Sequence, residues 1–344
     1  MNSILDNDIT ELVSQKKYFQ HFEGSSILIT GATGLIGSII AKALIKYGKI
    51  KVFACCRNKE KFNLIFKNYE CENLIPIYSD IFDLNILNID VDYIVHGASV
   101  TDSKTFVENP IKTIDVAVDG TRNLLRQCIG KKIKGFAYMS SLEVYGSFDY
   151  YEGIKNVTEE DFGSINPISV RSSYSESKRM VENICASYSK EFKIPVKICR
   201  LCQTFGAGVE YSDNRVFAQF ARSIIENKDI ILKTKGETVR NYCYTTDAVS
   251  GILTVLSKGK VGEAYNIANN ETTISIADMA TLVCNLYSKG ASKVIFDVTG
   301  DASKFGYNPT VRVKLDSKKL MSLGWNPVVS LDEMYKRLIG GMVK

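Results

Sequence analysis

Apolar and polar residues alternate in blocks along most of this chain. Short runs rich in Ile, Val and Leu predict buried strands, and the longer stretches between them have apolar residues at the three- and four-residue spacing of helices. The expected strands cover residues 27–30, 51–56, 74–78, 93–96, 135–139 and 195–201. The expected helices cover residues 35–47, 60–68, 109–128 and 171–188. This alternation predicts an α/β fold with a doubly wound parallel sheet.

The regular order of strand and helix ends near residue 202, which predicts a second, smaller structural unit. Apolar residues at helical spacing near the start of the chain predict an additional helix there. The expected units are an N-terminal helical extension (1–24), a sheet domain (25–202, with 240–270 returning to it) and a smaller C-terminal α/β lobe (203–239 and 271–344). In the helix over 109–128, the inner face is expected to contain Ile114, Val118, Leu124, Leu125 and Cys128.

Composition changes this picture little but excludes several classes of protein. The chain is 45% hydrophobic and 24% charged, and its net charge of +5 is scattered, so we expect no nucleic-acid partner. Nine cysteines form no regular framework, which is typical of reduced, buried thiols; Cys199 and Cys202 are interpreted as core residues. With two histidines, no metal site is expected. The absence of a membrane-length apolar run favours a soluble, cytoplasmic protein with no membrane partner.

Three glycines follow the first strand, where it is expected to turn into a helix. Gly31 would allow a tight turn, Gly34 would let the backbone approach a pyrophosphate, and Gly37 would let the helix pack closely on the strand. Their spacing differs from the commonest dinucleotide fingerprint, and a purely structural turn is the alternative. The residues predicted to contact a cofactor here are Gly31, Thr33, Gly34, Leu35, Ile36 and Gly37.

Residues after the next strands suggest which dinucleotide binds. The second strand ends in Arg57 where an acidic residue would hold the adenosine ribose, so NADP is favoured over NAD, although a solvated or adenine-stacked arginine leaves both open. Asp80, with Ile81 beside it, is expected near the adenine amino group or as a helix N-cap. Small residues at Ala98 and Ser99 leave room for the ribose and phosphates of the cofactor.

Tyr174 and Lys178 are four residues apart at the start of a helix and therefore share one face. A tyrosine has a pKa of about 10, and a nearby ammonium group lowers that pKa, so that the phenolate can accept a proton from an alcohol. Ser141, at the end of the preceding strand, could bind the same oxygen. Such a pair alone is usually a surface helix, but after a glycine turn it predicts hydride transfer with a nicotinamide cofactor.

The ordered set of motifs resembles the extended short-chain dehydrogenases/reductases, within the NAD-dependent epimerase/dehydratase family. The motifs are Thr-Gly-Ala-Thr-Gly-Leu-Ile-Gly (30–37), His-Gly-Ala-Ser (96–99), Ser-Ser-Leu-Glu-Val-Tyr-Gly (140–146), Tyr174 with Lys178, 200–206, 240–249 and 323–327. The resemblance implies a Rossmann-type NAD(P)-binding domain with a C-terminal substrate-binding lobe. Residues 166–179, 214–216 and 238–240 are most similar to UDP-glucuronate decarboxylases.

The same resemblance implies roles for further residues. Glu143 would assist chemistry after oxidation at sugar C4, and Arg215 and Arg240 would hold the diphosphate of a nucleotide sugar. Arg171 and Gln203 are likewise expected to bind substrate, although the family usually has asparagine at the latter position. The resemblance also implies a homodimer through a four-helix contact that includes residues 111–128 and 174–188.

Several functions are consistent with these residues. The first is transient oxidation at C4 followed by decarboxylation or epimerisation and return of the hydride. The second is an NADPH-dependent 4-keto reductase, which Arg57 favours. A 4,6-dehydratase is disfavoured because Leu142 stands where those enzymes have an aspartate. A non-catalytic nucleotide sensor is disfavoured because Ser141, Tyr174 and Lys178 are all present.

Overall fold

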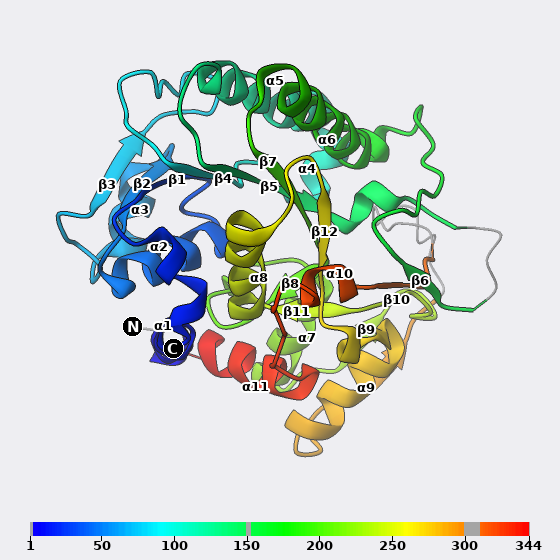
Figure 1. Ribbon diagram of the computed structural model, residues 1–344. Coiled ribbons are helices and arrows are strands. Elements are labelled where there is room, and N and C mark those ends of the chain that lie inside the picture. Colours follow the sequence, from blue (N-terminus) through cyan, green and yellow to red (C-terminus); the bar gives the residue numbers. More distant parts are fainter. Residues whose placement is uncertain (1–2, 149–152, 299–309, 344) are drawn as a thin grey trace.

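In the computed structural model, seven parallel strands form one central sheet (Figure 1). The structure describes residues 3–148, 153–298 and 310–343. From one edge to the other the strands are β12 (Ala264–Ile267), β7 (Val196–Leu201), β5 (Gly135–Ser141), β4 (Tyr93–His96), β1 (Ser26–Thr30), β2 (Lys51–Cys56) and β3 (Leu74–Tyr78). The order reverses between β4 and β1, so the expected doubly wound, Rossmann-type α/β fold is confirmed.

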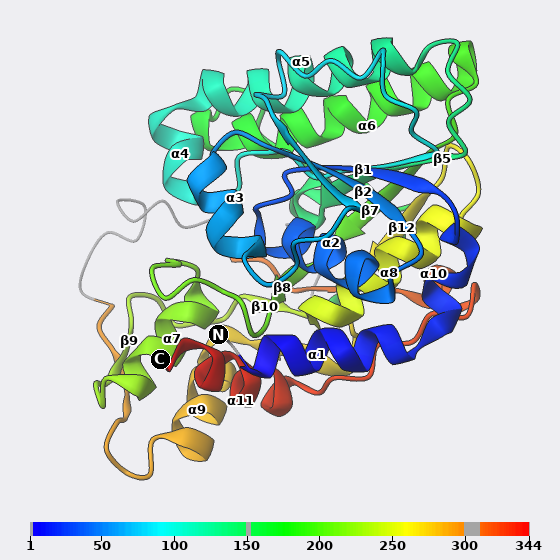
Figure 2. The same cartoon turned by 90° about the vertical axis from the view of Figure 1, so that its left-hand side faces the viewer.

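Helices cover both faces of the sheet (Figure 2). One layer contains α5 (Pro110–Cys128) and α6 (Ser173–Phe192), and the other contains α2 (Leu35–Tyr47) and α8 (Thr245–Lys258). Short helices α3 (Lys59–Phe66) and α4 (Ser103–Glu108) join the first strands to their neighbours. Because both faces are covered, Ile27 and Ile29 of β1 enter one core while Leu28 enters the other. This explains why the strand is apolar at every one of these positions.

A third core lies beneath the sheet domain in the C-terminal lobe (Figure 2). It is built mainly from α7 (Val216–Ile225), α9 (Ile276–Tyr287) and α11 (Leu331–Met342), with α10 (Lys318–Met321) nearer β12. Paired short strands complete the lobe: β8 (Gln203–Phe205) with β11 (Tyr242–Tyr244), β9 (Ile230–Leu232) with β14 (Val294–Phe296), β10 (Val239–Arg240) with β13 (Ile274–Ser275), and β6 (Lys155–Val157) with β15 (Val313–Leu315). Within the described ranges, no helix is long and apolar enough to cross a membrane.

The N-terminal helix α1 (Ser3–Ser14) joins the sheet domain to the C-terminal lobe. It packs on α2 and α8, and also on α11. Asp6 accepts a hydrogen bond from Tyr69 of the sheet domain at 2.9 Å, whereas Asp8 pairs with Arg337 of α11 at 2.5 Å. The first helix is therefore part of the folded body, because its polar residues as well as its apolar face are bound on both sides.

One predicted core position was wrong. Ile114 of α5 is 37% exposed and lies on the outer face of the helix, not on the inner one. The inner face instead contains Thr113 and Thr121, both buried. Each threonine hydroxyl donates to a carbonyl one turn earlier in the helix, so the polar groups are satisfied without water. The other four predicted residues, Val118, Leu124, Leu125 and Cys128, do pack in the core. The apolar pattern misplaced only Ile114, because it did not count these threonines as buried.

Candidate active site

The glycine turn between β1 and α2 has a geometry that only glycine allows at two positions. Gly31 has φ 71°, and a Cβ there would lie 2.9 Å from the Gly97 carbonyl carbon. A Cβ on Gly37 would lie 2.3 Å from the Gly31 carbonyl oxygen. The turn therefore packs directly on the end of β4. Helix α2 begins at Leu35, and within the described residues no side chain of its N-cap residue Gly34 caps the N–H groups of its first turn. This open turn before a helix N-terminus fits a dinucleotide phosphate.

A buried hydrogen-bond chain shapes the end of β4 beside this turn. The hydroxyl of Thr121 donates to a backbone carbonyl of α5, so it accepts from Nε2 of His96 at 2.8 Å. The Nδ1 atom then accepts from Thr30 at 2.7 Å, and Thr30 Oγ1 accepts the N–H groups of Gly97 and Ala98. Burial, assisted by the charge of Lys178, lowers the pKa of His96 to about 3. The neutral ring thus fixes the backbone that leads to Ala98.

The predicted adenosine end of the site lies at the ends of β2 and β3. Arg57 is 67% exposed at its side chain and pairs with Asp80 at 3.7 Å. The Asp80 carboxylate also accepts the N–H of Phe82. The side chain of Ile81 is buried against α5, where a Cβ on Gly120 would lie 2.7 Å from it. Ile81 can therefore offer a cofactor its backbone but not its side chain.

The structure brings Ser141, Tyr174 and Lys178 together. Ser141 ends β5 near the buried Tyr174, whose pKa it lowers, while Lys178 donates to the carbonyl of Met139 at 2.8 Å. Burial is the main cause that raises the pKa of Tyr174 above its ordinary value. The charge of Glu143 raises it further, and the nearby Ser141 hydroxyl opposes the rise. Burial also lowers the pKa of Lys178 to about 8.

Glu143 lies beside this group on the short 3-10 helix Leu142–Tyr145, at the end of β5. Both of its oxygens accept from Arg171, at 3.1 and 3.2 Å, and one accepts from Ser175 at 2.8 Å. Burial alone would raise the pKa of Glu143, but Arg171, Arg240 and Ser175 lower it below its ordinary value. The Nε atoms of Arg171 and Arg240 are buried with no hydrogen-bond partner in the described parts of the chain. The carboxylate is thus ionised, paired with Arg171 and stabilised further by the charge of Arg240.

Sequence reasoning missed a ring that packs on the predicted base. Phe106 of α4 stacks on Tyr174 with ring centroids 4.3 Å apart and planes at 12°, and the Arg171 guanidinium lies 5.0 Å from the Phe106 centroid. Ser173 fixes the ring further by donating to the Phe106 carbonyl at 2.9 Å. The helix of six residues that contains Phe106 gave no catalytic motif, so only the three-dimensional contact identifies it.

The remaining predicted substrate residues belong to the lobe. Arg215 is the N-cap residue of α7 and pairs with Asp213 at 2.6 Å. Its charge lowers the pKa of Tyr174, so it lies toward the same centre. Gln203 is half-buried at the start of β8, opposite Tyr242. Among the described residues, no group of three or more His, Cys, Asp or Glu side chains could hold a metal ion.

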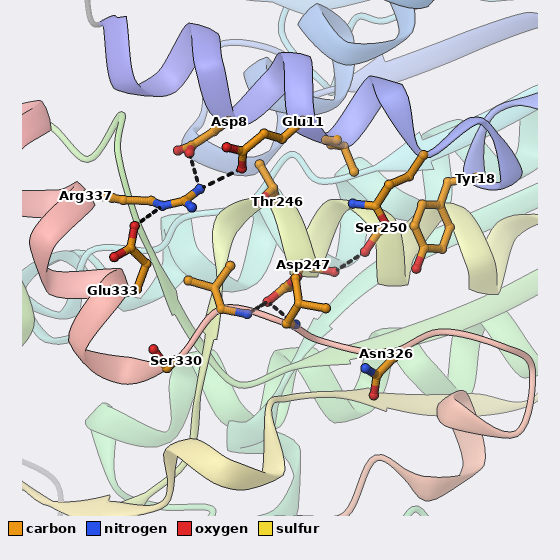
Figure 3. A pocket seen from close by; sticks show the side chains of 14 residues that line it. Asp8, Glu11, Tyr18, Thr246, Asp247, Ser250, Asn326, Ser330, Glu333 and Arg337 are labelled. Carbon is orange, nitrogen blue, oxygen red and sulfur yellow. Dashed lines mark hydrogen bonds and ion pairs between the residues drawn. The ribbon is translucent and has the colours of Figure 1, made fainter.

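A cavity of about 160 Å³ lies elsewhere, between α1, α8 and α11 (Figure 3), and none of the predicted site residues lines it. Arg337 fills one side with three ion pairs to carboxylates at 2.5 to 3.1 Å. On the other side the buried Asp247 accepts the N–H groups of Val328 and Val329 at 3.1 and 3.0 Å. Because these polar groups already have partners, the cavity is a junction between elements and not the reaction centre.

The sheet topology, the glycine turn and the hydroxyl–lysine group define a doubly wound α/β protein of the dinucleotide-binding class. Comparison with known proteins agrees: the model of the NAD dependent epimerase/dehydratase family matches residues 27–268. The chain belongs to this family.

Named relatives cover nearly the whole chain. UDP-glucuronic acid decarboxylase 1 of Xenopus tropicalis is 28% identical and covers 97% of this chain and 76% of that protein. UDP-glucuronic acid decarboxylase 6 of Arabidopsis thaliana is also 28% identical, over 92% of this chain and 88% of that protein. The structure is similar to that of UDP-glucuronic acid 4-epimerase from Bacillus cereus in complex with NAD, with a TM-score of 0.76, 25% identity and coverage of 91% and 97%.

Proposed function

We propose that this protein is an NAD(P)-dependent enzyme that transiently oxidises a nucleotide-linked sugar at C4, decarboxylates or epimerises it, and returns the hydride. The observation that carries this proposal is the position of Ser141, Tyr174 and Lys178. Ser141 ends β5 and the glycine turn follows β1, so both lie at the carboxyl edge of the parallel sheet, where open α/β folds bind ligands. The named decarboxylase and epimerase relatives support the same class of substrate.

Each residue of the group has a distinct part in this chemistry. A bound nicotinamide ring would supply the hydride acceptor. Tyr174 accepts the proton of the sugar hydroxyl, Ser141 hydrogen-bonds the same oxygen, and the Lys178 charge favours the phenolate. In the free protein the pKa of Tyr174 is raised, chiefly by burial, and the charges of Arg171 and Arg215 oppose that rise. Positive groups around the site therefore offset part of the cost that burial adds to deprotonation of Tyr174.

Glu143 and its arginines support decarboxylation or epimerisation over dehydration. The neighbouring Leu142 is buried and carries no proton to donate, so water loss lacks an acid at that position. Among the residues that the structure describes, the buried Nε–H groups of Arg171 and Arg240 have no hydrogen-bond partner, which suits a bound phosphate or carboxylate. The substrate we expect is a nucleoside diphosphate sugar.

The cofactor form and one alternative function depend on Arg57. Its exposed side chain at the end of β2, with Asp80 as its partner at 3.7 Å, is free to turn toward a 2′-phosphate. On this observation we propose NADP as the preferred cofactor. The similar epimerase structure contains NAD, which supports NAD as the alternative. An NADPH-dependent 4-keto reductase is the second candidate, because Arg57 is the observation that favours it.

We also propose a homodimer. Ile111 and Ile114 of α5 and Met180 of α6 are exposed on these two adjacent helices, at 66%, 37% and 53%. A second copy that covered these residues would form a four-helix contact. Light scattering with the variant Ile111→Lys tests this proposal: the wild type is expected at twice the chain mass and the variant at the chain mass.

The function is tested with a panel of nucleotide sugars and product identification by mass spectrometry. Without added reductant, a product with a changed sugar and no net change in bound NAD(P)H supports the proposal. Stoichiometric consumption of NADPH would select the reductase, and binding without turnover would select a non-catalytic role. Tyr188→Phe, on the same helix as Tyr174 but well beyond it along the helix, is the matched control and should keep full activity.

A further inference from the structure

The ammonium group of Lys178 lies in an enclosed place behind Tyr174. The residue is 3% exposed, and the hydrogen-bond acceptor of its Nζ atom among the described residues is the Met139 carbonyl, at 2.8 Å. The ring centroid of Tyr138 is 4.8 Å from Nζ, and that of Tyr174 is 5.7 Å away. A buried lysine held by one carbonyl loses much of its hydration, which favours the neutral amine.

The titratable groups that face this ammonium do not replace the lost hydration by direct bonds. Glu182 and Cys185 lie on the same helix, and their influence favours the charged lysine. The Glu182 carboxylate, however, is committed to Arg200 at 2.8 Å and to Ser140 at 2.6 Å. His96 of β4 is neutral and fully buried. Besides the carbonyl, two ring faces lie against Nζ, and the Tyr138 ring at 4.8 Å is nearer than the Tyr174 ring at 5.7 Å.

The hydroxyl of Tyr138 does not explain why a tyrosine is present. It is buried and has no hydrogen-bond partner in the described parts of the protein, which is unfavourable. The ring is 2% exposed and its face is directed at Lys178. Tyr138 therefore contacts Lys178 through its ring and not through its hydroxyl.

We propose that Tyr138 is a positioning residue whose ring holds the Lys178 ammonium charged and in place behind Tyr174. The consequence for catalysis rests on the proposed function, in which the charged lysine favours the Tyr174 phenolate. The contact itself does not depend on the substrate. Loss of the ring should therefore change the titration of Lys178 whether or not a substrate is known.

The test is NMR titration of the full-length protein labelled at the lysine ε-carbon, with the Lys178 signal assigned by Lys178→Met. Tyr138→Leu should lower the pKa of Lys178 by about one unit, as expected for loss of a desolvated cation–π contact. Tyr138→Phe should restore the wild-type titration, because the ring remains. Phe136→Leu is the matched control: it removes a buried ring from the same face of β5, and the pKa of Lys178 should not move.

If Tyr138→Leu does not fold, trifluorophenylalanine at position 138 is the second variant. It keeps the ring but removes the negative potential of the ring face. The pKa of Lys178 should therefore still fall relative to Tyr138→Phe. An unchanged or higher pKa in either variant overturns the proposal. A fall in Phe136→Leu equal to that in Tyr138→Leu also overturns it, because the effect would then be general loosening. If no nucleotide sugar is converted, the proposed function fails while this titration still decides the role of Tyr138.

Discussion

Arg171→Gln would remove the cation that neutralises the carboxylate of Glu143. The pair joins side chains that are 19% and 15% exposed, through two hydrogen bonds of 3.2 and 3.1 Å. Breaking a buried pair from one side costs about 3–5 kcal/mol, because the remaining charge is left unpaired. Glu143 keeps the Ser175 bond and the nearby charge of Arg240, so we expect a lower figure, about 2–3 kcal/mol of unfolding free energy.

The pH dependence of this loss follows from the sign of the shift. In the wild type the pKa of Glu143 lies below its ordinary value, so the pair stabilises the fold above that value and the stabilisation is lost as pH falls through the folded-state pKa. Urea unfolding of wild type and Arg171→Gln should thus differ most near pH 7, and the difference should shrink as pH falls below 4.5, the ordinary pKa of glutamate, and through the lower folded-state pKa. Arg126→Gln, an exposed arginine on α5, is the matched control and should cost less than about 0.5 kcal/mol.

Two results would refute this reasoning. A loss near pH 7 no larger than that of the control would mean that the pair is effectively solvated. A loss that stays constant as pH falls well below 4.5 would mean that the change acts through packing on Phe106 and not through the charge of Glu143.

Three other changes test separate parts of the structure. Gly37→Ala should weaken NAD and NADP binding by at least about tenfold in equilibrium titration, since its Cβ would meet the Gly31 carbonyl oxygen at 2.3 Å; unchanged affinity would contradict the tight turn. Burial raises the pKa of Asp247 to about 6, so stability should fall by about 2–3 kcal/mol as pH rises from 4 through 6, and Asp247→Asn should abolish that slope in urea unfolding. Arg57→Gln should lower NADP affinity by about tenfold and leave NAD affinity unchanged, measured by titration; equal effects would count against a 2′-phosphate contact.

The sequence predicted the central sheet well because its strands are buried on both faces and therefore read as apolar runs. The predicted bounds 51–56, 74–78 and 93–96 are those of β2, β3 and β4. The three-residue strands β8 and β11 were not predicted, since their pairing joins segments about 40 residues apart and each is too short to show periodicity. The predicted position of Ile114 was wrong because the hydroxyls of Thr113 and Thr121 donate to backbone carbonyls four residues earlier. With these hydrogen bonds made, the threonines can be buried as apolar residues are.

Individual site residues were easier to predict than their contacts. Glu143 and Arg171 were each expected in the site. Nothing in the sequence indicates that they form an ion pair, or that Ser175 donates a hydrogen bond to the same carboxylate. The stacking of Phe106 on Tyr174 and the approach of Tyr138 to Lys178 join residues from different elements. One usable signal was present: Tyr138 is a hydroxyl-bearing aromatic in an otherwise apolar strand, two residues before the Ser-Ser motif begins at 140.

The most direct test of the proposed function is turnover by Tyr174→Phe with bound cofactor and a converted nucleotide sugar. The ring and its stacking on Phe106 remain, while the group that accepts the proton is removed. We predict that turnover falls by about 10²–10⁴-fold, the usual contribution of a general base, with cofactor affinity unchanged and Tyr188→Phe fully active. Turnover by Tyr174→Phe at the wild-type rate would contradict the assignment of Tyr174 as the base.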